Sequence, residues 1–320
     1  MKVLVTGGTG FVGNALVTRC ISDSTAEVRT TIRRSSAALP PGVEPVVVTD
    51  LASDTEWGRT VAGMDAIVHT AARVHVMHDR TADPLAEFRT VNVAGTLNLA
   101  RQAAAAGVRR FVFISSIKVN GERTSPGRPF RPGDAPAPID PYGISKLEAE
   151  DGIRAIAKES GMEVVVIRPV LVYGPGVKAN FLSMMRWLYR GIPLPLGAIH
   201  NARSLVALEN LVDLIVTCMN HPRAANQTFL VSDGEDLSTT VLLRRTAAAL
   251  GRPARLIPIP SWMLETACRA LGKEDVALRL CGSLQVDISA TRTLLGWSPP
   301  LGVDDALRQT ARHFLEQWIP

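Results

Sequence analysis

The amino terminus places a short apolar run, a turn with regularly spaced glycines and the beginning of a helix in immediate succession. Val3 to Thr6 is strand-like, Gly7, Gly10 and Gly13 recur every three residues, and helical periodicity starts near Phe11. Because glycine has no Cβ, such a turn bends tightly and approaches a bound group closely. The free N–H groups and the dipole at the helix start favour an anion. Together these features predict a pyrophosphate-binding turn that opens a βαβ unit.

The first half of the chain continues this alternation of short apolar runs with helical patterns. The expected strands are Val3 to Thr6, Glu27 to Ile32, Pro45 to Val48, Ala66 to His69, Arg110 to Ser115 and Val164 to Arg168. The expected helices begin near Phe11 and cover Glu87 to Ala106 and Pro141 to Ser160. Strands that alternate with helices of this length indicate crossover connections. The pattern predicts an α/β fold with a Rossmann-type doubly wound parallel sheet.

The alternation of strand-like and helical runs becomes irregular after Arg168, where prolines, glycines and short helices dominate. We expect a dinucleotide-binding domain over residues 1–168, to which 205–235 returns with a helix at Leu208 to Met219 and a strand at Thr228 to Val231. Residues 169–204 and 236–320 are expected to form a smaller, discontinuous C-terminal substrate-binding region. A stretch rich in proline, glycine and arginine between Glu122 and Pro141 predicts a long loop. Its position before a helix with candidate catalytic residues leaves open a substrate-side lid or a merely irregular segment.

Composition narrows the classes of partner. The 320 residues are 46% hydrophobic and 20% charged, and the net charge of +5 is spread along the chain rather than gathered in a basic arm. We therefore expect anionic small molecules as partners and no nucleic acid. No apolar run reaches the roughly 18 residues that span a bilayer, so membrane insertion is not expected. The four cysteines lack CxxC spacing and a partnering histidine tract, which predicts no metal site and reduced thiols in a cytoplasmic protein.

Basic residues follow the second expected strand. A dinucleotide site usually reads the adenosine ribose with an acidic residue at this place, but the run from Val28 to Ser35 offers Arg33 and Arg34 instead. Guanidinium groups bind phosphate oxygens in pairs. The run therefore favours NADP(H), whose 2′-phosphate the two arginines would hold, while NAD(H) remains possible. Asp50 and Leu51 follow the third strand, where they either contact the adenine or cap a helix.

Two further groups carry candidate chemistry. Tyr142 and Lys146 are four residues apart on an expected helix, so they share a face. A nearby ammonium favours a phenolate, which would lower the pKa of the tyrosine from about 10 and suit it to proton exchange with a carbonyl or an alcohol. Ser115 and Ser116 end the fifth strand, at the sheet edge where ligands bind. A serine there either holds a substrate oxygen or caps a turn.

The order of these features resembles the extended short-chain dehydrogenase/reductase family, also described as NAD-dependent epimerases and dehydratases. The likeness rests on TGGTGFVG at 6–13, HTAA at 69–72, VNVAGTLNL at 91–99, ISSIKVNG at 114–121, YGISK at 142–146 and RPVLVYGPG at 168–176. It implies Ser116, Tyr142 and Lys146 as catalytic residues, with Asn92 in support. It also implies cofactor contacts from Gly7, Thr9, Gly10, Phe11, Val12 and Gly13, from Tyr142 and Lys146, and from Ala71 and the segment around Arg168 to Val172.

A narrower resemblance concerns the substrate. HTAARVHVM at 69–77, GPGVKANF at 174–181 and NARSLVALENLVDLI at 201–215 are similar to bacterial nucleotide-sugar 4-epimerases and to UDP-2-acetamido-2,6-dideoxy-hexos-4-ulose 4-reductases of surface-polysaccharide biosynthesis. Asn180 and Arg203 fall where nucleotide-sugar members contact the diphosphate. The resemblance also suggests a homodimer built on the helices Glu87 to Ala106 and Pro141 to Ser160.

The reaction is the least determined inference. The basic residues after the second strand favour net reduction of a 4-keto nucleotide sugar by NADPH, since a reductase consumes NADPH whereas an epimerase returns the hydride. An Arg-xx-Asp pattern common in epimerases is not found near the carboxyl end. The alternative is a UDP-hexose or UDP-N-acetylhexosamine 4-epimerase with bound NAD. A sensor of NADP without catalysis is a third hypothesis, which the joint presence of Tyr142 and Lys146 disfavours.

Overall fold

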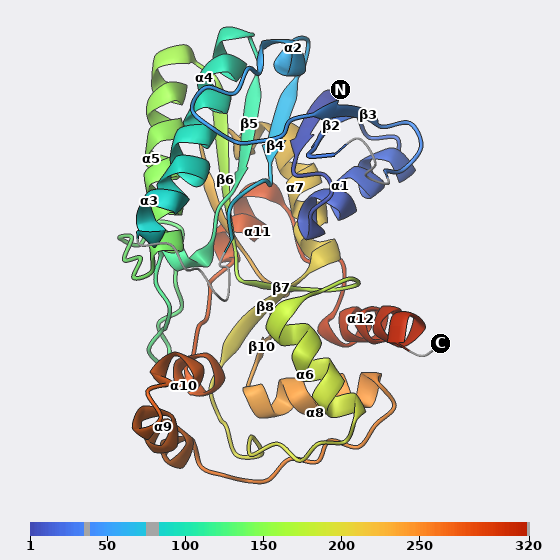
Figure 1. The fold of residues 1–320 in the computed structure, drawn as a ribbon, viewed down its shortest axis with the longest axis vertical. Helices are drawn as coiled ribbons and strands as arrows, with labels where there is room; N and C mark the ends of the chain where they lie inside the picture. Colours follow the sequence, from blue (N-terminus) through green and yellow to red (C-terminus); the bar gives the residue numbers. More distant parts are fainter. Residues whose placement is uncertain (35–38, 75–82, 319–320) are drawn as a thin grey trace.

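The structure, a computed structural model, describes residues 1–34, 39–74 and 83–318 (Figure 1). In the order in which they lie, the strands of the larger sheet are β3 (Glu44–Val47), β2 (Glu27–Ile32), β1 (Lys2–Thr6), β4 (Ala66–His69), β5 (Arg110–Ile114), β6 (Glu163–Pro169) and β9 (Thr228–Val231). Every neighbouring pair in this sheet is parallel. The predicted Rossmann-type parallel sheet is confirmed.

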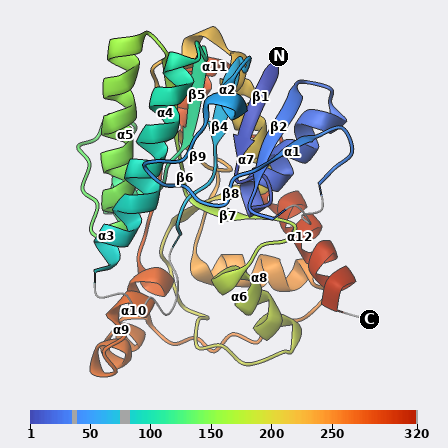
Figure 2. The same ribbon diagram turned by 45° about the horizontal axis from the view of Figure 1, so that its top comes forward.

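Helices cover both faces of this sheet. One face carries α1 (Phe11–Ser22), α7 (Leu208–Asn220) and α11 (Ser289–Leu295); the other carries α2 (Gly58–Val61), α4 (Thr96–Ala105) and α5 (Pro141–Ser160), as Figures 1 and 2 show. Alternate residues of one strand point to opposite faces. Val3 and Val5 accordingly pack with α1 and α7, whereas Leu4 packs with α4 and α5. The continuous apolar runs read from the sequence are thus strands buried on both faces.

The expected single helix over Glu87 to Ala106 is interrupted. The chain forms α3 (Pro84–Phe88), then a π-helical segment, η1 (Arg89–Gly95), and only then α4. π-Helical turns occur mostly as local bulges and frequently at functional sites. Asn92 lies in this segment, and the bulge places its side chain against the backbone of Arg73 and the side chain of Ser145.

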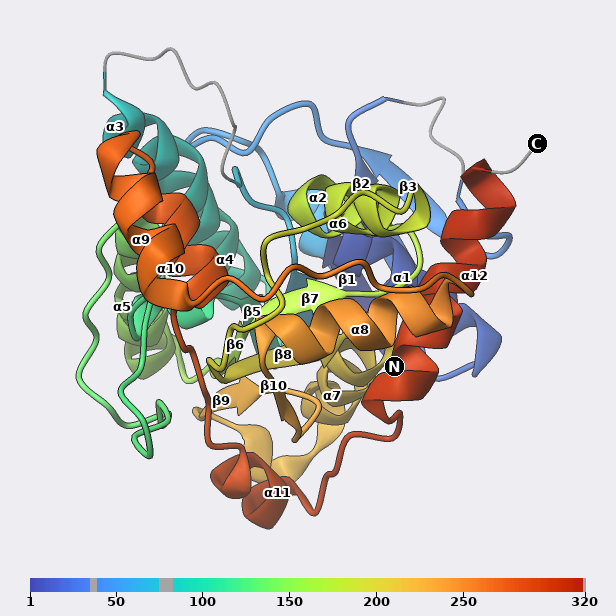
Figure 3. The ribbon, with the colours of Figure 1, turned by 90° about the horizontal axis from the view of Figure 1, so that it is seen from below.

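A smaller sheet forms the second part of the molecule. It consists of β10 (Asp236–Leu237), β8 (Arg203–Ala207) and β7 (Leu171–Tyr173), and Figure 3 shows α6 (Ala179–Tyr189), α8 (Thr239–Ala249) and α12 (Val303–Trp318) grouped around it. These helices bury a separate apolar cluster that includes Phe181, Leu188 and Phe314. β8 spans the expected boundary at residue 205 and pairs with β7 and β10, whereas β9 joins the larger sheet as expected.

The remaining elements connect the two parts. α9 (Ser261–Ala270) and α10 (Glu274–Cys281) form a hairpin beside the smaller sheet, and the short helices η2 (Ile117–Val119) and η3 (Pro222–Ala224) follow β5 and α7. The expected long loop after Glu122 lies against the segment that follows α10. Phe130 donates to the carbonyl oxygen of Gln285 at 2.9 Å and accepts from the N–H of Asp287 at 2.8 Å. The loop thus ties the substrate side of the larger sheet to the smaller part.

The strand order reverses direction next to β1. From β1 the chain builds outward through β2 and β3, and it then returns to place β4 on the other side of β1. In open parallel sheets, ligands bind beyond the carboxyl ends of the strands at such a reversal. The glycine turn follows β1 and Ala71 follows β4, so both lie at this point.

Candidate active site

The glycine turn lies where the strand order reverses, and its geometry leaves no room for side chains. Gly7 has φ of 74°, and its carbonyl oxygen accepts from the N–H of Gly10 at 2.8 Å. A Cβ on Gly13 would stand 2.2 Å from that same oxygen, so only glycine lets α1 approach the turn this closely. Within the described residues no side chain caps α1, which leaves its first N–H groups facing the turn. This cradle fits a dinucleotide pyrophosphate.

The other turn residues lie around this cradle. Thr9 and Gly10 are exposed, while the side chains of Phe11 and Val12 pack against the apolar core beneath α1. Ala71 faces the turn from the end of β4, since a Cβ on Gly7 would stand 3.0 Å from the Ala71 Cα. The structure therefore brings the sequence-predicted turn residues and Ala71 together.

The predicted adenosine end is exposed. Arg33 and Arg34 lie beyond the end of β2 and make no hydrogen bond or ion pair within the described residues, so both are available to a ligand. Ser35 of the same run lies outside those residues, as do residues 75–77 of the HTAARVHVM motif. Asp50 is exposed and accepts from the N–H of Leu51 at 2.8 Å. It does not cap α2, which begins after Trp57.

Tyr142 and Lys146 share one face of α5, as their spacing predicts. Asp140 caps this helix by accepting from the N–H of Gly143 at 2.7 Å, which places Tyr142 in the first turn. Lys146 donates to the carbonyl oxygen of Ile114 at 2.9 Å, and its Nζ lies 5.9 Å from the centre of the Tyr142 ring. The helix therefore presents a phenol and an amine at the carboxyl end of β5.

Burial decides the protonation of both groups. Lys146 is 2% exposed, and burial lowers the pKa of its amine to about 7. Burial also raises the pKa of the Tyr142 phenol above its usual value, and the nearby carboxylate of Asp140 adds to this increase. The expected lowering of the tyrosine pKa by the lysine is therefore not found. A half-neutral amine attracts a phenolate too weakly to offset the loss of water around the phenol.

Asn92 reaches α5 through a residue that the sequence analysis did not single out. Its Nδ2 donates to Ser145 Oγ at 3.0 Å and to the carbonyl oxygen of Arg73 at 3.0 Å. Ser145 in turn donates to the carbonyl oxygen of Tyr142 at 2.8 Å. Asn92 thus supports the turn of α5 that carries the tyrosine. Ser145 is the fourth residue of the YGISK motif, so the motif contained this signal.

The two serines after β5 have different surroundings. Ser116 is half-buried, and its Oγ accepts only from the N–H of Lys118, at 3.2 Å, within the described residues. It acts as the cap of η2 and keeps its hydroxyl proton free for a substrate oxygen. Ser115 is buried and donates to Glu150 at 2.5 Å. Of the pair, Ser116 is therefore the one open to a ligand.

The side chain of Arg168 is engaged inside the protein. It is 3% exposed, and its guanidinium donates to both carboxylate oxygens of Glu150, at 2.9 and 2.6 Å, and to Asn120 at 2.9 Å. This differs from the expectation that the arginine lines the cofactor channel. The physical reason is Glu150, a fully buried carboxylate that needs a counterion. Sequence reasoning did not single out Glu150, although it follows Lys146 by one helical turn.

His69, from the HTAA motif, has a structural role. It is buried between Thr6 and Thr96, whose hydroxyls lie 2.7 and 3.0 Å from its two ring nitrogens. Burial lowers its pKa to about 3, and the charge of Lys146 acts in the same direction. The ring is therefore neutral, and it links β4 to β1 and to α4.

The two predicted diphosphate contacts lie on the smaller part of the molecule. Asn180 is exposed in the first turn of α6. Arg203 begins β8 and donates to the carbonyl oxygen of Gly282 at 3.0 Å. Within the described residues it has no carboxylate partner, and burial lowers its pKa. A half-buried guanidinium without a counterion suits an anionic ligand.

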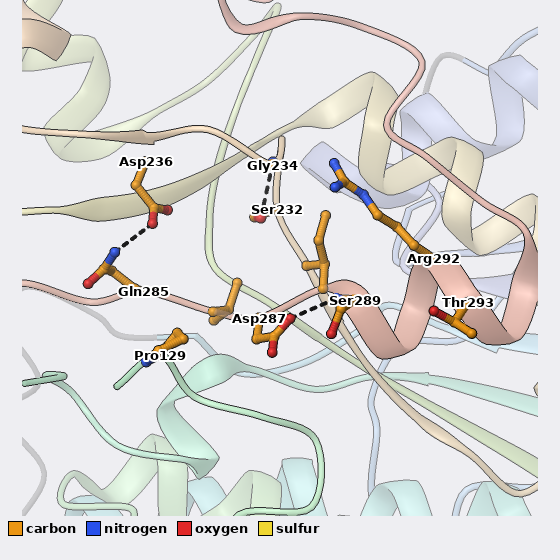
Figure 4. Close-up of a pocket in the computed structure, with 11 residues that line it drawn as sticks. Pro129, Ser232, Gly234, Asp236, Gln285, Asp287, Ser289, Arg292 and Thr293 are labelled. Atoms are coloured by element: carbon orange, nitrogen blue, oxygen red, sulfur yellow. Dashed lines mark hydrogen bonds between the residues drawn. The ribbon is translucent and has the colours of Figure 1, made fainter. Parts of the chain in front are cut away.

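A pocket of about 400 Å³ opens beside the end of β9 (Figure 4). Its polar walls are largely paired already. Asp236 accepts from Gln285 at 2.7 Å, and Asp287 accepts from the N–H of Ser289 at 2.9 Å. None of its lining residues belongs to the glycine turn or to the set around Tyr142. This hollow is therefore separate from the candidate catalytic residues.

The described ranges contain neither a membrane-spanning helix nor a metal cluster. Over residues 1–34, 39–74 and 83–318, no helix is both long and apolar enough to cross a bilayer. In the same ranges, no three histidine, cysteine or acidic side chains cluster in a way that could hold a metal ion.

Comparison with known proteins identifies the family. Residues 3–232 match the NAD dependent epimerase/dehydratase family. The chain belongs to this family. A "UDP-glucose 4-epimerase" of Vibrio cholerae is 51% identical over 316 residues, which cover 98% of this chain and 96% of the relative. The extended short-chain dehydrogenase resemblance is thereby confirmed, and the epimerase/dehydratase family member described here is an enzyme.

Solved structures share the fold. A UDP-glucose 4-epimerase of Thermotoga maritima with UDP-glucose is 22% identical, has a TM-score of 0.78, and aligns over 99% of each chain. A UDP-glucuronic acid 4-epimerase of Bacillus cereus in complex with NAD is 18% identical with the same TM-score, over 99% of this chain and 100% of that one. At these identities the likeness concerns the fold of the epimerase/dehydratase family.

The expected reduction of a 4-keto nucleotide sugar is wrong. The relative that is 51% identical over nearly the whole chain is a 4-epimerase, which supports the alternative hypothesis instead. The error has a physical cause. The reductase hypothesis rested on Arg33 and Arg34 at the adenosine end of the dinucleotide, whereas the nicotinamide reacts at the other end. Positive side chains at the adenosine ribose indicate whether a 2′-phosphate can bind there. They do not indicate whether the reaction is a net reduction.

The glycine turn yields a first prediction. Gly13→Ala places a Cβ against the Gly7 carbonyl, and such overpacking costs about 1–3 kcal/mol. Because α1 must then move away from the turn, we expect dinucleotide affinity to fall about tenfold or more. Fluorescence titration with NAD(H) measures it. Gly58→Ala is the control, since no atom lies within 4 Å of the added Cβ. Equal affinity of the Gly13 variant and the wild type would contradict the role of this contact.

The buried amine yields a second prediction. Since the pKa of Lys146 is about 7 when folded and about 10.4 when unfolded, stability rises with pH between these values. The cost of burying the ammonium is fully present below pH 7. Lys146→Met should therefore raise the melting temperature of the dinucleotide-free protein by roughly 2 °C or more at pH 6, and this gain should shrink by pH 9.5. Lys158→Met, exposed on the same helix, should show no such dependence. A pH-independent difference for Lys146→Met would refute the assignment.

Proposed function

We propose that the enzyme is a UDP-hexose 4-epimerase that works with a retained nicotinamide dinucleotide. The observation that carries this proposal is the 51% identity, over 98% of the chain, to a UDP-glucose 4-epimerase. The arrangement of Tyr142, Lys146 and Ser116 at the carboxyl end of β5 supports it, because C4 epimerisation requires one group to exchange a proton with the C4 oxygen. UDP-hexoses and their N-acetyl counterparts are both candidate substrates.

Tyr142 is the proposed acid and base. Its phenol would take the proton of the C4 hydroxyl while the hydride leaves carbon, and it would return that proton when the hydride comes back. Ser116, with its free hydroxyl proton, would hold the same C4 oxygen. Lys146, held by the Ile114 carbonyl, would keep the phenol in place from the next turn of the helix. When bound in the glycine cradle, the dinucleotide supplies the hydride acceptor and donor.

Epimerisation also requires the sugar to turn. The hydride must return to the opposite face of C4, so the hexose has to present both faces to one nicotinamide. A firm hold on the nucleotide and a loose hold on the sugar meet this need. Arg203 suits the first task, since its guanidinium is half-buried and faces no carboxylate within the described residues. Asn180, exposed on α6, would add a contact to the diphosphate.

We propose NAD(H) as the retained dinucleotide. An epimerase regenerates its cofactor in every turnover, so it has no need of NADPH, the dinucleotide that a cell keeps reduced for biosynthesis. The Bacillus cereus 4-epimerase of the same fold is described in complex with NAD. The exposed Arg33 and Arg34 have no anionic partner among the described residues, and they would still accommodate a 2′-phosphate if one were present.

The reaction itself can be tested directly. The purified enzyme, without added dinucleotide, is expected to interconvert UDP-galactose and UDP-glucose, or the N-acetyl pair, as followed by NMR of the sugar signals. Tyr142→Phe should lower kcat by about 100-fold or more with little change in KM, because only proton exchange is removed. Tyr189→Phe, whose ring packs on Phe314 away from the site, serves as control. Absence of interconversion for both pairs would contradict the proposal.

The cofactor assignment has its own test. Mass spectrometry of nucleotides released from the purified protein should show NAD(H). Arg33→Ala/Arg34→Ala should leave NAD(H) affinity within about twofold, because NAD(H) has no 2′-phosphate for these side chains to bind. The same variant should bind NADP(H) more weakly than the wild type does. NADP(H) as the released nucleotide, or a tenfold loss of NAD(H) affinity, would overturn the assignment.

A further inference from the structure

We propose that the buried ion pair of Glu150 and Arg168 is a positioning device that holds α5, and with it Tyr142 and Lys146, in register with the end of β5. This inference rests on the proposed epimerase function for its kinetic test, but its geometry stands by itself. Neither residue touches a reacting atom in the proposed mechanism. Both are positioning residues that act through the helix.

Glu150 belongs to the same helical face as the catalytic pair. Tyr142, Lys146 and Glu150 are spaced by four residues, so they lie one above another along α5. The side chains of the last two both reach the end of β5. Lys146 donates to the carbonyl oxygen of Ile114 at 2.9 Å, and Glu150 accepts from the Ser115 hydroxyl at 2.5 Å. Consecutive strand residues thus bind consecutive turns of the helix, which fixes both the height and the rotation of α5.

Arg168 extends this connection to the loop beside Ser116. Its guanidinium holds both oxygens of Glu150 and also donates to Asn120 at 2.9 Å. Asn120 ends the short helix η2 that Ser116 begins, and its amide donates to the carbonyl oxygen of Arg131 at 3.2 Å. One arginine therefore joins the helix that carries Tyr142 to the turn that carries Ser116. The separation of those two hydroxyls depends on it.

The pair also controls which cation neutralises Glu150. Arg154 provides a second contact, from Nη2 to a carboxylate oxygen at 2.9 Å, but its side chain is 40% exposed. The charged or titratable groups around Glu150 are Arg154 and Lys146 on its own helix and Arg168 on β6. The groups around Lys146 are Glu150 and Tyr142 on its own helix and His69 on β4. With Arg168 in place, Lys146 remains bound to the Ile114 carbonyl. Without it, the ammonium of Lys146 becomes the nearest buried counterion of Glu150.

The key variant is Arg168→Gln, compared with Arg168→Lys, which keeps the charge but loses the fork. We expect Arg168→Gln to lower kcat about tenfold or more while KM for the UDP-hexose stays within about twofold, since misplacement affects the reacting groups and not the nucleotide contacts. We also expect the pH profile of kcat to move to lower pH by about one unit, because Glu150 then stabilises the ammonium of Lys146, and a nearby ammonium favours the phenolate of Tyr142. Arg168→Lys should recover part of kcat and return the pH profile toward that of the wild type.

Two controls separate positioning from loss of stability. Arg110→Gln removes another buried arginine, which pairs with the half-buried Glu163 at 2.7 Å at the opposite end of β5. It should lower the melting temperature without changing kcat or the pH profile of the folded enzyme. Glu150→Gln/Arg168→Gln removes both charges at once and so avoids an uncompensated buried charge if a single variant fails to fold. It should fold and still show a reduced kcat.

A measurement that needs no turnover keeps the two proposals apart. Hydrogen exchange mass spectrometry should show faster exchange over residues 141–147 and 114–121 in Arg168→Gln and in the double variant, but not in Arg110→Gln. If the wild type is inactive but the variants show this exchange pattern, the epimerase assignment is wrong and the positioning device still stands. Unchanged exchange, or an active Arg168→Gln with wild-type kcat and pH profile, would overturn the positioning device.

Discussion

The active site is built on charges that the fold buries between α5 and the ends of β5 and β6. Lys146, Glu150 and Arg168 are at most 3% exposed, and each would be costly to bury alone. Together they satisfy one another and the backbone: Glu150 binds Arg168, and Lys146 binds the Ile114 carbonyl. A buried ion pair adds little net stability, but it tolerates few geometries. The proposed chemistry would use this restriction, because proton exchange by Tyr142 would require a helix that neither slides nor rotates.

The same burial sets the electrostatics of the site before any ligand is bound. The pKa of Lys146 falls to about 7 and that of Tyr142 rises, both because water is excluded from α5. The Tyr142 phenol is therefore protonated before a ligand binds. A bound oxidised nicotinamide is itself a cation, and a cation near a phenol favours the phenolate. In the proposed mechanism, a dinucleotide bound in the glycine cradle would therefore also favour the phenolate of Tyr142.

The framework and the placement of the candidate residues could be predicted from the sequence, but the contacts between residues that are distant in the chain could not. The glycine turn, the parallel sheet and the Tyr142–Lys146 face depend on local spacing, so they could be read directly. The π-helical segment at Arg89–Gly95 could not, because it exists to direct Asn92 toward Ser145, which is 53 residues away. Glu150 escaped notice for a similar reason. A carboxylate on a helix is usually solvated, and the burial of this one is explained by its contacts with Arg168 on the following strand, with Ser115 and with Arg154.

The error over the reaction is of a different kind. Arg33 and Arg34 lie just beyond the end of β2, and within the part of the chain that the structure describes they make no hydrogen bond or ion pair. The prediction of net reduction was drawn from these arginines. They lie at the adenosine end of the predicted dinucleotide site, whereas hydride transfer takes place at the nicotinamide end. An epimerase removes a hydride from C4 and a proton from its oxygen and then returns both, whereas a reductase performs only a transfer of the second kind, so both can use the same tyrosine, lysine and serine. What separates them is whether the keto sugar stays and turns or leaves. In the proposed mechanism, Arg203 would influence this choice through its hold on the nucleotide, so the distinguishing information would lie in the smaller part of the molecule, away from the motifs that identify the family.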